Sequence, residues 1–381
     1  MKLNIKANTE SMNHTLPLVK LSVLRPFATE LHERGIDPEP VFESVGLTEG
    51  AIFEADLSVH VMVIHQFVEN AAKSAEDPFF GARVGSKLDV QGWAILEDAE
   101  ARASTVGDFL SIFIARSNEI ASSVTEHLNI VGQTAVFGET RSFAPQILPA
   151  QNDAFMVALG LAVLRRALRN RLDPSKVTVT VSDPKVLPSE FDLMHPMRGN
   201  RMGFCIHFPS SWLSLKLNPV SSSLATEEIS SSAADGFVQS FRQMLRAHIE
   251  QIDLSASKCA ALASMSQHKL KRRLAENGTN ITNEISFVRQ QYAREVLVTT
   301  SRSISDIATV LGFTDAANFA RAFRRANGMT PTAFRKLQEV EDGEKKLSCS
   351  PNQTLIPARP TAASSALPTL TISLTRSTDL P

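Results

Sequence analysis

The chain has 381 residues, of which 43% are hydrophobic and 21% charged, so it is long enough for two domains with separate cores. No apolar run reaches the ~18 residues of a membrane helix, and the start MKLNIKANTESMNHTLPL lacks a signal-peptide core. These features exclude an integral membrane protein and predict a cytoplasmic one. The three cysteines, Cys205, Cys259 and Cys349, lie too far apart for a disulfide framework or a thiolate zinc site, so no metal is expected.

The net charge of -1 hides an asymmetry along the chain. Residues 236–337 contain 15 Lys and Arg against 7 Asp and Glu, a balance of +8, and the rest contains 24 basic and 33 acidic residues, a balance of -9. A basic module joined to an acidic one predicts that the basic module has a polyanionic partner.

The amino-terminal part reads as a flexible leader, 1–20, followed by an α+β domain, 21–217. Its first elements are expected to be helical. Residues 21–57 predict two short helices broken at Gly35, Pro38 and Pro40. A longer helix is expected over 59–74, and another runs through Phe109 and Phe113 after an N-cap at Thr105 or Ser104.

The later elements of this domain change to a strand period. Residues 127–131 and 134–140 flank Gly132 and Gln133, which is typical of a β-hairpin. A helix over 152–171 follows, basic near its end, and then the alternating strands KVTVTVSDP and MGFCIHFP. This order predicts a mostly antiparallel sheet backed by helices.

Two segments lack the pattern of a folded element. Residues 218–235 are Ser-rich and predict a linker between the domains. Residues 341–381 are rich in Ser, Thr and Pro without helical periodicity, and predict a disordered tail after an all-helical domain at 236–340.

The basic domain repeats itself, with residues 259–278 resembling residues 307–328. Each unit predicts a short helix, a turn and a capped second helix, which is a helix-turn-helix. In both second helices an apolar pair at i and i+4 can anchor the core. The matched positions are Ala260 with Ala308, Met265 with Phe313, Ser266 with Asp315, Leu270 with Phe319, Arg272 with Arg321 and Leu274 with Phe323, with Thr314 as one extra residue.

The outward faces of the two second helices are polar. A basic face on a single helix most often only contacts solvent. Here the basic face occurs on two helices with the same caps and anchors, which favours DNA recognition. Side chains expected to face a major groove are Gln267, His268, Lys271, Arg272, Ala316, Ala317, Asn318, Arg321 and Arg325. Those expected to meet phosphates are Lys269, Arg273 and Arg324.

The segment between the units has apolar residues at helical spacing over 281–301, which predicts one rigid connecting helix. If both units enter successive major grooves of one DNA face, they stand about 34 Å, or 10 bp, apart. Ser303 to Asp306 resembles a capping box for the second unit, and Thr330-Pro331 is expected to open a final helix.

The segment SISDIATVLGFTDAANFARAFRRANGMTPTAFRK resembles the AraC-type (AraC/XylS) DNA-binding domain. The resemblance implies seven helices, two of them recognition helices, binding upstream of promoters and contacts with RNA polymerase. It places His268, Lys271 and Arg272 of the first unit against bases or the adjoining backbone, and in the second unit it does the same for Ala316, Ala317, Asn318 and Arg321. The family often has Leu and Gly where this chain has Ala263 and Ser264, which predicts looser packing of the first unit.

The amino-terminal domain is similar to the effector-sensing domain of regulators related to those of ornithine utilisation. The similarity lies in FFGARVGSKLDVQGWAILEDAEARASTVGDFL and RMGFCIHFPSSWLSLKLNPV. It implies a pocket for a small-molecule effector and a homodimer, but assigns no ligand. Trp93, His65 and Arg201 are candidate contacts, although packing or capping suits the first two better and a surface charge suits Arg201.

An enzyme is the main alternative class. The chain has no GxxxxGK[ST], HExxH or GxSxG motif and no GxGxxG between a strand and a helix, so no catalytic residue or cofactor is expected. His60 and His65 do not share a helix face well, and His195 has no evident partner. A repair protein with a methyl-accepting cysteine is a third reading, for which Cys205 offers little support. The expected function is therefore sequence-specific transcription regulation by an effector-responsive activator that reads double-stranded DNA.

Overall fold

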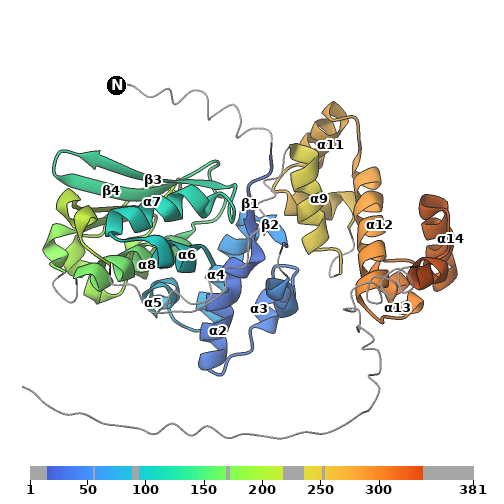
Figure 1. Cartoon of the computed structure of the whole chain (residues 1–381), viewed down its shortest axis with the longest axis horizontal. Coiled ribbons are helices and arrows are strands. Elements are labelled where there is room, and N and C mark those ends of the chain that lie inside the picture. The colour runs from blue at the N-terminus through green and yellow to red at the C-terminus, as the bar shows by residue number, and fades with distance from the viewer. Residues whose placement is uncertain are drawn as a thin grey trace, which may run out of the picture.

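Two hydrophobic cores organise the computed structural model, one in a mixed α/β region and one in a helical region beside it (Figure 1). The structure describes residues 15–54, 56–87, 94–168, 172–217, 236–250 and 254–337. The linker expected at 218–235 and the disordered tail expected at 341–381 lie outside the described residues. No described helix is long and apolar enough to cross a bilayer.

The helices of the α/β region follow the expected order, and the predicted N-cap is confirmed at Thr105. Its Oγ1 accepts from the amide of Asp108 at 3.1 Å, and its own amide donates back to the Asp108 carboxylate at 3.0 Å. The helices are α2 (Arg25–Glu33), α3 (Glu39–Glu43), α4 (Val61–Ser74), α5 (Phe80–Lys87), α6 (Ala94–Arg102), α7 (Val106–Ser117) and α8 (Ala150–Leu168).

Helix α5 packs very closely on α8 because it presents glycine to it. A Cβ at Gly81 would lie 2.1 Å from the backbone oxygen of Gln151, and one at Gly85 would lie 2.3 Å from that of Phe155. Any larger residue at either position would force the helices apart. This contact holds α8 at the centre of the region, where it also packs on the sheet.

A five-stranded sheet forms the other layer, in the order β3-β4-β7-β5-β6. It is antiparallel except between β5 and β6, which confirms a mostly antiparallel sheet. The predicted hairpin turns at Gly132-Gln133, and Gly132 has a φ of +62°, as the first position of a type II′ turn requires. The strands are β3 (Val124–Val131), β4 (Thr134–Arg141), β5 (Thr178–Val181), β6 (Met197–Arg198) and β7 (Cys205–Pro209).

A second sheet of two short strands lies between the two regions (Figure 1). Strand β1 (Leu18–Lys20) pairs antiparallel with β2 (Ser58–His60). The expectation of a flexible leader over 1–20 is therefore wrong for its last residues, and the helix expected from residue 59 begins at Val61. The physical reason is long-range: Leu16 and Leu18 are buried in the helical core, whereas Val19 is buried in the α/β core.

The helical region consists, in its described part, of six helices and a final helical stretch at 331–337, which matches the seven helices that the resemblance implies. Thr330 caps that last stretch, since its Oγ1 accepts from the amide of Ala333 at 3.3 Å. The six are α9 (Phe237–Ala247), α10 (Ala256–Leu262), α11 (Gln267–Glu276), α12 (Ile281–Thr299), α13 (Ile304–Val310) and α14 (Ala316–Asn327).

Candidate nucleic-acid interface

The two predicted helix-turn-helix units are α10 with α11 and α13 with α14. Their second helices begin at matched caps. Ser266 Oγ accepts from the amide of Lys269 at 3.2 Å, and the Asp315 carboxylate accepts from the amide of Asn318 at 2.6 Å. Each cap satisfies an amide that the helix itself leaves free, so both helices start at defined residues.

The apolar anchors of both second helices are buried. Leu270 and Leu274 of α11 and Phe319 and Phe323 of α14 are each at most 1% exposed. In the second unit the rings form a chain, with Phe323 5.8 Å from Phe319 and 5.5 Å from Phe334 between centroids. Burying one face in this way turns the opposite face of each helix outward.

The two turns carry different residues at their left-handed position. Gly312 has a φ of +74°, and the matching Ser264 has a φ of +49°, which is strained for a residue with a side chain. Ser264, where the family often has Gly, therefore has a left-handed backbone conformation. The neighbouring departure, Ala263, is buried.

Helix α12 joins the units and is held at several points along its length. Near its start, the Glu284 carboxylate is buried and accepts from Arg242 of α9 at 2.6 Å. Farther along, Gln290 accepts from the Asn327 amide at 3.0 Å, and Arg294 donates to the same Asn327 side chain. These contacts fix α12 against α9 and α14, so the connection between the two units is rigid rather than a tether.

The structure places the predicted DNA-facing side chains of α11 on its outer surface. Most are exposed, but Arg273 is half-buried and its guanidinium lies 4.9 Å from the ring centroid of Phe237. Arg272 lies 3.6 Å from the carboxylate of Glu276, one turn along the helix. The exposed residues are Gln267, His268, Lys269, Lys271 and Arg272.

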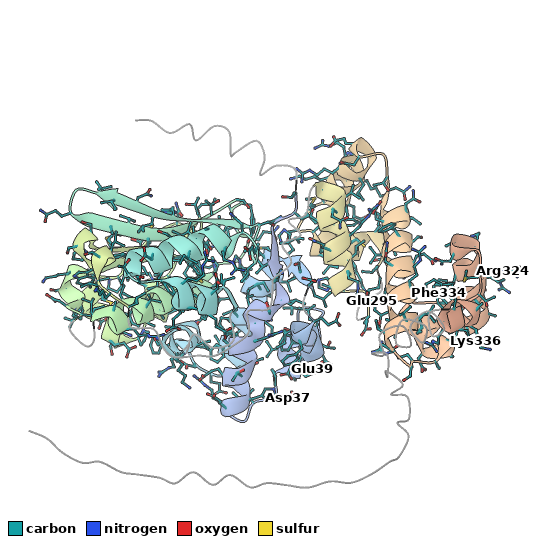
Figure 2. All side chains as sticks on the ribbon, in the orientation of Figure 1. Asp37, Glu39, Glu295, Arg324, Phe334 and Lys336 are labelled. Carbon is teal, nitrogen blue, oxygen red and sulfur yellow. The ribbon has the colours of Figure 1, made fainter. Side chains whose placement is uncertain are left out.

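The predicted residues of α14 lie on one side of that helix. Ala317, Arg321, Arg324 and Arg325 are exposed, and Ala316 and Asn318 are half-buried. Figure 2 shows Arg324 on the outer side of α14, away from α12.

Asn318 and Arg321 form a small network at the start of α14. The Asn318 amide donates to Thr314 Oγ1 at 2.6 Å and to the Asp315 carboxylate at 2.8 Å, and its oxygen accepts from Arg321. The side-chain amide of Asn318 is therefore already hydrogen-bonded, whereas the Arg321 guanidinium has further donors to offer. This network holds Arg321 at the solvent face of the helix.

The acidic residues of the region lie mainly behind this face. Glu250, Glu284 and Glu295 pair with arginines of α9 and of the loop after α12, at distances of 2.6 to 3.0 Å. Among the described residues, Lys269, Lys271, Arg324 and Arg325 have no acidic partner within 4 Å. Two capped helices with uncompensated positive charge are suited to a duplex.

Comparison with known proteins agrees with this geometry over both regions. A family model described as a helix-turn-helix domain matches residues 259–337, and one described as the arabinose-binding domain of AraC transcription regulator, N-terminal, matches residues 35–217. The chain is an AraC-type DNA-binding transcription regulator.

The relatives of the regulator match it over different lengths. The ornithine utilization regulator of Pseudomonas aeruginosa is 22% identical over 348 residues, 86% of this chain and 99% of that protein. The transcriptional activator NphR of Rhodococcus sp is 30% identical over 95 residues, 25% of this chain and 28% of that protein. The crystal structure of the transcriptional regulator CdpR from Pseudomonas aeruginosa is 17% identical, with a TM-score of 0.34, covering 83% of this chain and 98% of that one.

The alternative hypotheses of an enzyme or a repair protein are not supported. Both family models describe parts of transcription regulators. Cys205 lies half-buried in β7, and burial raises the pKa of its thiol, which disfavours the thiolate that a methyl acceptor needs.

The three candidate effector contacts fall in different places. His65 of α4 is buried and lines a cavity inside the α/β region. Arg201 is exposed and donates to the backbone oxygen of Gln146 at 3.2 Å, and Trp93 lies outside the described residues. Two further residues of the cavity, Glu126 and Glu139, were not predicted from the sequence, because only the strand register brings them together.

Proposed function

We propose that the regulator is an effector-responsive activator that reads two successive major grooves with α11 and α14. The observation that carries this proposal is the pair of matched helix-turn-helix units, each with a capped second helix, buried anchors and an outward basic face. Helix α12, held against α9 and α14, supports a constant spacing between the units, which we propose is near one turn of DNA, about 34 Å.

The base-reading roles are proposed for Gln267, His268, Lys271, Arg272, Ala316, Ala317, Asn318, Arg321 and Arg325. Arginine can bond bidentately to guanine, and alanine can contact the thymine methyl group. Among these residues Arg321 is the best supported, since Asn318 holds its guanidinium at the exposed face. Phosphate contacts are proposed for Lys269, Arg324 and Arg273, of which Arg273 is the least accessible.

The domain boundaries are part of this proposal: sensing domain 21–217, linker 218–235, DNA-binding domain 236–340 and tail 341–381. RNA polymerase and a second copy of the chain are proposed as partners on the family resemblance, and the cytoplasm as the compartment in which its DNA partner lies.

We further propose that the sensing domain controls the readers through the contacts that join the two regions. Leu16 donates its amide to Ser240 Oγ of α9 at 2.9 Å, and His248 Nδ1 donates to the backbone oxygen of Gly46 at 3.1 Å. Ser264, in the turn before α11, lies 3.3 Å from His60 Nδ1 at the end of β2. A change in the sensing domain that moved these contacts would reposition α11. Coupling requires that an effector bind the two arrangements with different affinity, and these contacts would differ between them.

The experiment is selection of duplexes from a random pool by the full-length chain, followed by titration of the selected duplex at increasing salt. The proposal expects a consensus of two short segments about 10 bp apart and an affinity that falls steeply with salt. A chain that showed no salt-sensitive preference for any duplex would refute it.

A further inference from the structure

A cavity of about 80 Å³ lies inside the sensing domain, between the helices and the β3–β4 hairpin. Most of its wall is apolar, including Phe27, Ile64, Phe113 and Phe155. A cavity needs roughly 10 to 15 Å³ of such space to hold a single water, and this one exceeds that minimum several times over. The cavity is therefore large enough for a small organic ligand.

Three polar atoms at this cavity have no hydrogen-bond partner among the described residues, and a fourth, Glu139 Oε1, has an ion pair with Arg141 at 3.1 Å. The three are His65 Nδ1, Ser123 Oγ and Glu126 Oε2. The four residues are 0 to 8% exposed, so solvent satisfies little of their surface. Buried polar atoms are nearly always paired, and leaving them without a partner costs about 1 to 3 kcal/mol each. Three in one cavity, beside the Glu139 carboxylate, indicate that a partner belongs there.

The two carboxylates face each other across the hairpin, because Glu126 of β3 and Glu139 of β4 are direct cross-strand partners. Like charges directly opposite each other destabilise a sheet. Folding alone gives no reason to place this pair in a buried wall, since Gln at either position would keep the shape without the repulsion.

The protein supplies one cation against three carboxylates here. Arg141 lies 3.1 Å from the Glu139 carboxylate, but its guanidinium also binds the buried Asp153 of α8 at 2.5 Å. Burial lowers the pKa of His65 to about 3 and that of His60 to about 4, so neither imidazole adds a positive charge at neutral pH. Burial also raises the pKa of Glu126, and raises that of Glu139 to about 7. The cavity is short of positive charge.

We propose that this cavity binds a small organic cation, a primary amine on a short apolar chain, with the ammonium between Glu126 and Glu139 and the chain against the phenylalanines. An ammonium has three donors and no acceptor, which suits a site whose free atoms are mainly acceptors. The inference rests on the proposed function, because it names the class of effector that the sensing domain takes.

The cavity also touches the strand that joins the two regions. Val19 of β1 lines the cavity, whereas its neighbour Leu18 and the preceding Leu16 are buried in the helical core. Successive side chains of a strand point to opposite sides, so one strand contacts both. A ligand that shifted Val19 would therefore shift residues packed against α9.

Isothermal titration of the full-length chain with three probes of similar shape tests the proposal. The probes are n-butylamine, 1-butanol and butanoate. The amine is expected to bind, with the alcohol and the acid at least about tenfold weaker. The Glu126→Gln and Glu139→Gln variants should each lose about tenfold or more in amine affinity, whereas Glu190→Gln, at an exposed position of the same domain, should leave it unchanged.

Melting temperatures show whether a variant loses amine affinity only because it fails to fold. Each Gln variant removes a charge from a like-charged buried pair, so its melting temperature should hold or rise while amine affinity falls. Amine affinity of the native chain should also weaken between pH 8 and pH 6, as Glu139 takes up a proton.

Equal binding of the alcohol or the acid, no binding of the amine, or full amine affinity in both Gln variants would each overturn the proposal. Binding to the selected duplex is measured on the same samples. If the chain binds DNA but not the amine, the ligand class is wrong and the proposed DNA reading stands, and loss of specific DNA binding would instead refute that reading.

Discussion

Arg321 and Lys269 are both exposed on the two second helices but are expected to contact different parts of the duplex. Arg321 is held at the outer face of α14 by Asn318, as a base reader needs, whereas Lys269 is a flexible point charge near the start of α11. Their substitutions should therefore be distinguishable by sequence and by salt.

Replacing Arg321 by alanine is expected to cost about 1 to 3 kcal/mol on the selected duplex and to relax specificity at one position. Replacing Lys269 by alanine should weaken all duplexes similarly and reduce the salt slope by about one. Fluorescence anisotropy across salt and single-base variants measures both. If the two substitutions had the same profile, the division into base and phosphate contacts would be wrong.

Glu139 gives a second expectation at the scale of a residue, because burial raises its pKa to about 7 from its ordinary value of 4.5. The folded state therefore holds the proton more tightly than the unfolded state. Its contribution to stability is complete below about pH 4.5 and is lost as the pH rises through 7.

The Glu139→Gln variant lacks this loss, so its stability relative to the native chain should increase from pH 5 to pH 8. The increase is expected to be on the order of 2 kcal/mol. Urea unfolding followed by tryptophan fluorescence measures it at each pH, with Glu190→Gln as the control. A difference that did not change with pH would mean that the Glu139 pKa is not raised.

At the scale of elements, the sequence predicts well what is decided locally. The caps at Ser266 and Asp315, the anchors at i and i+4 and the hairpin turn at Gly132 depend on residues a few positions apart, and all three features are present. The contacts of β1 with α9 and the pairing of Glu126 with Glu139 depend on partners far apart in the chain or on strand register. The periodicity of the sequence indicates neither long-range partners nor strand register.

The two turns between helices provide a matched stability test. Gly312→Ala places a side chain at a φ of +74° and a Cβ 3.2 Å from the Arg289 guanidinium, so it should destabilise the helical region by about 1 to 2 kcal/mol. Ser264→Gly relieves strain at a φ of +49° and should stabilise it by about 0.5 to 1 kcal/mol.

The unfolding of the helical region can be followed separately, because Tyr292 in α12 is the chain's one tyrosine. Urea unfolding monitored by tyrosine absorbance gives the two changes. Opposite signs are expected, and a stabilising Gly312→Ala or a destabilising Ser264→Gly would show that the turn conformations differ from those described.

At the scale of the whole molecule, the segment before the sensing domain contributes to the core of the other domain. Leu16 is fully buried among the helices, and the backbone of Leu18 pairs with β2. The DNA-binding domain is therefore completed by a strand from the far end of the chain, which is why a boundary drawn by sequence pattern misses it.

The Leu16→Ala variant should destabilise the helical region by about 2 to 5 kcal/mol, the usual cost of truncating a buried leucine. Tyrosine absorbance should show the change, and tryptophan fluorescence should show a smaller one, because both tryptophans precede the linker. Leu193→Ala, at a position 65% exposed, is the control and should change stability by no more than about 0.5 kcal/mol. An unchanged Tyr292 transition in Leu16→Ala would contradict the shared core.

We propose that α11 and α14, held at a fixed spacing by α12, read adjacent turns of one duplex. The most direct measurement is the affinity of the full-length chain for its selected duplex and for the same duplex with 5 bp inserted between the two recognised segments. The insertion turns one segment to the opposite face, so affinity should fall about 100-fold or more, to that of one unit alone. An affinity that the half-turn insertion left unchanged would contradict the claim.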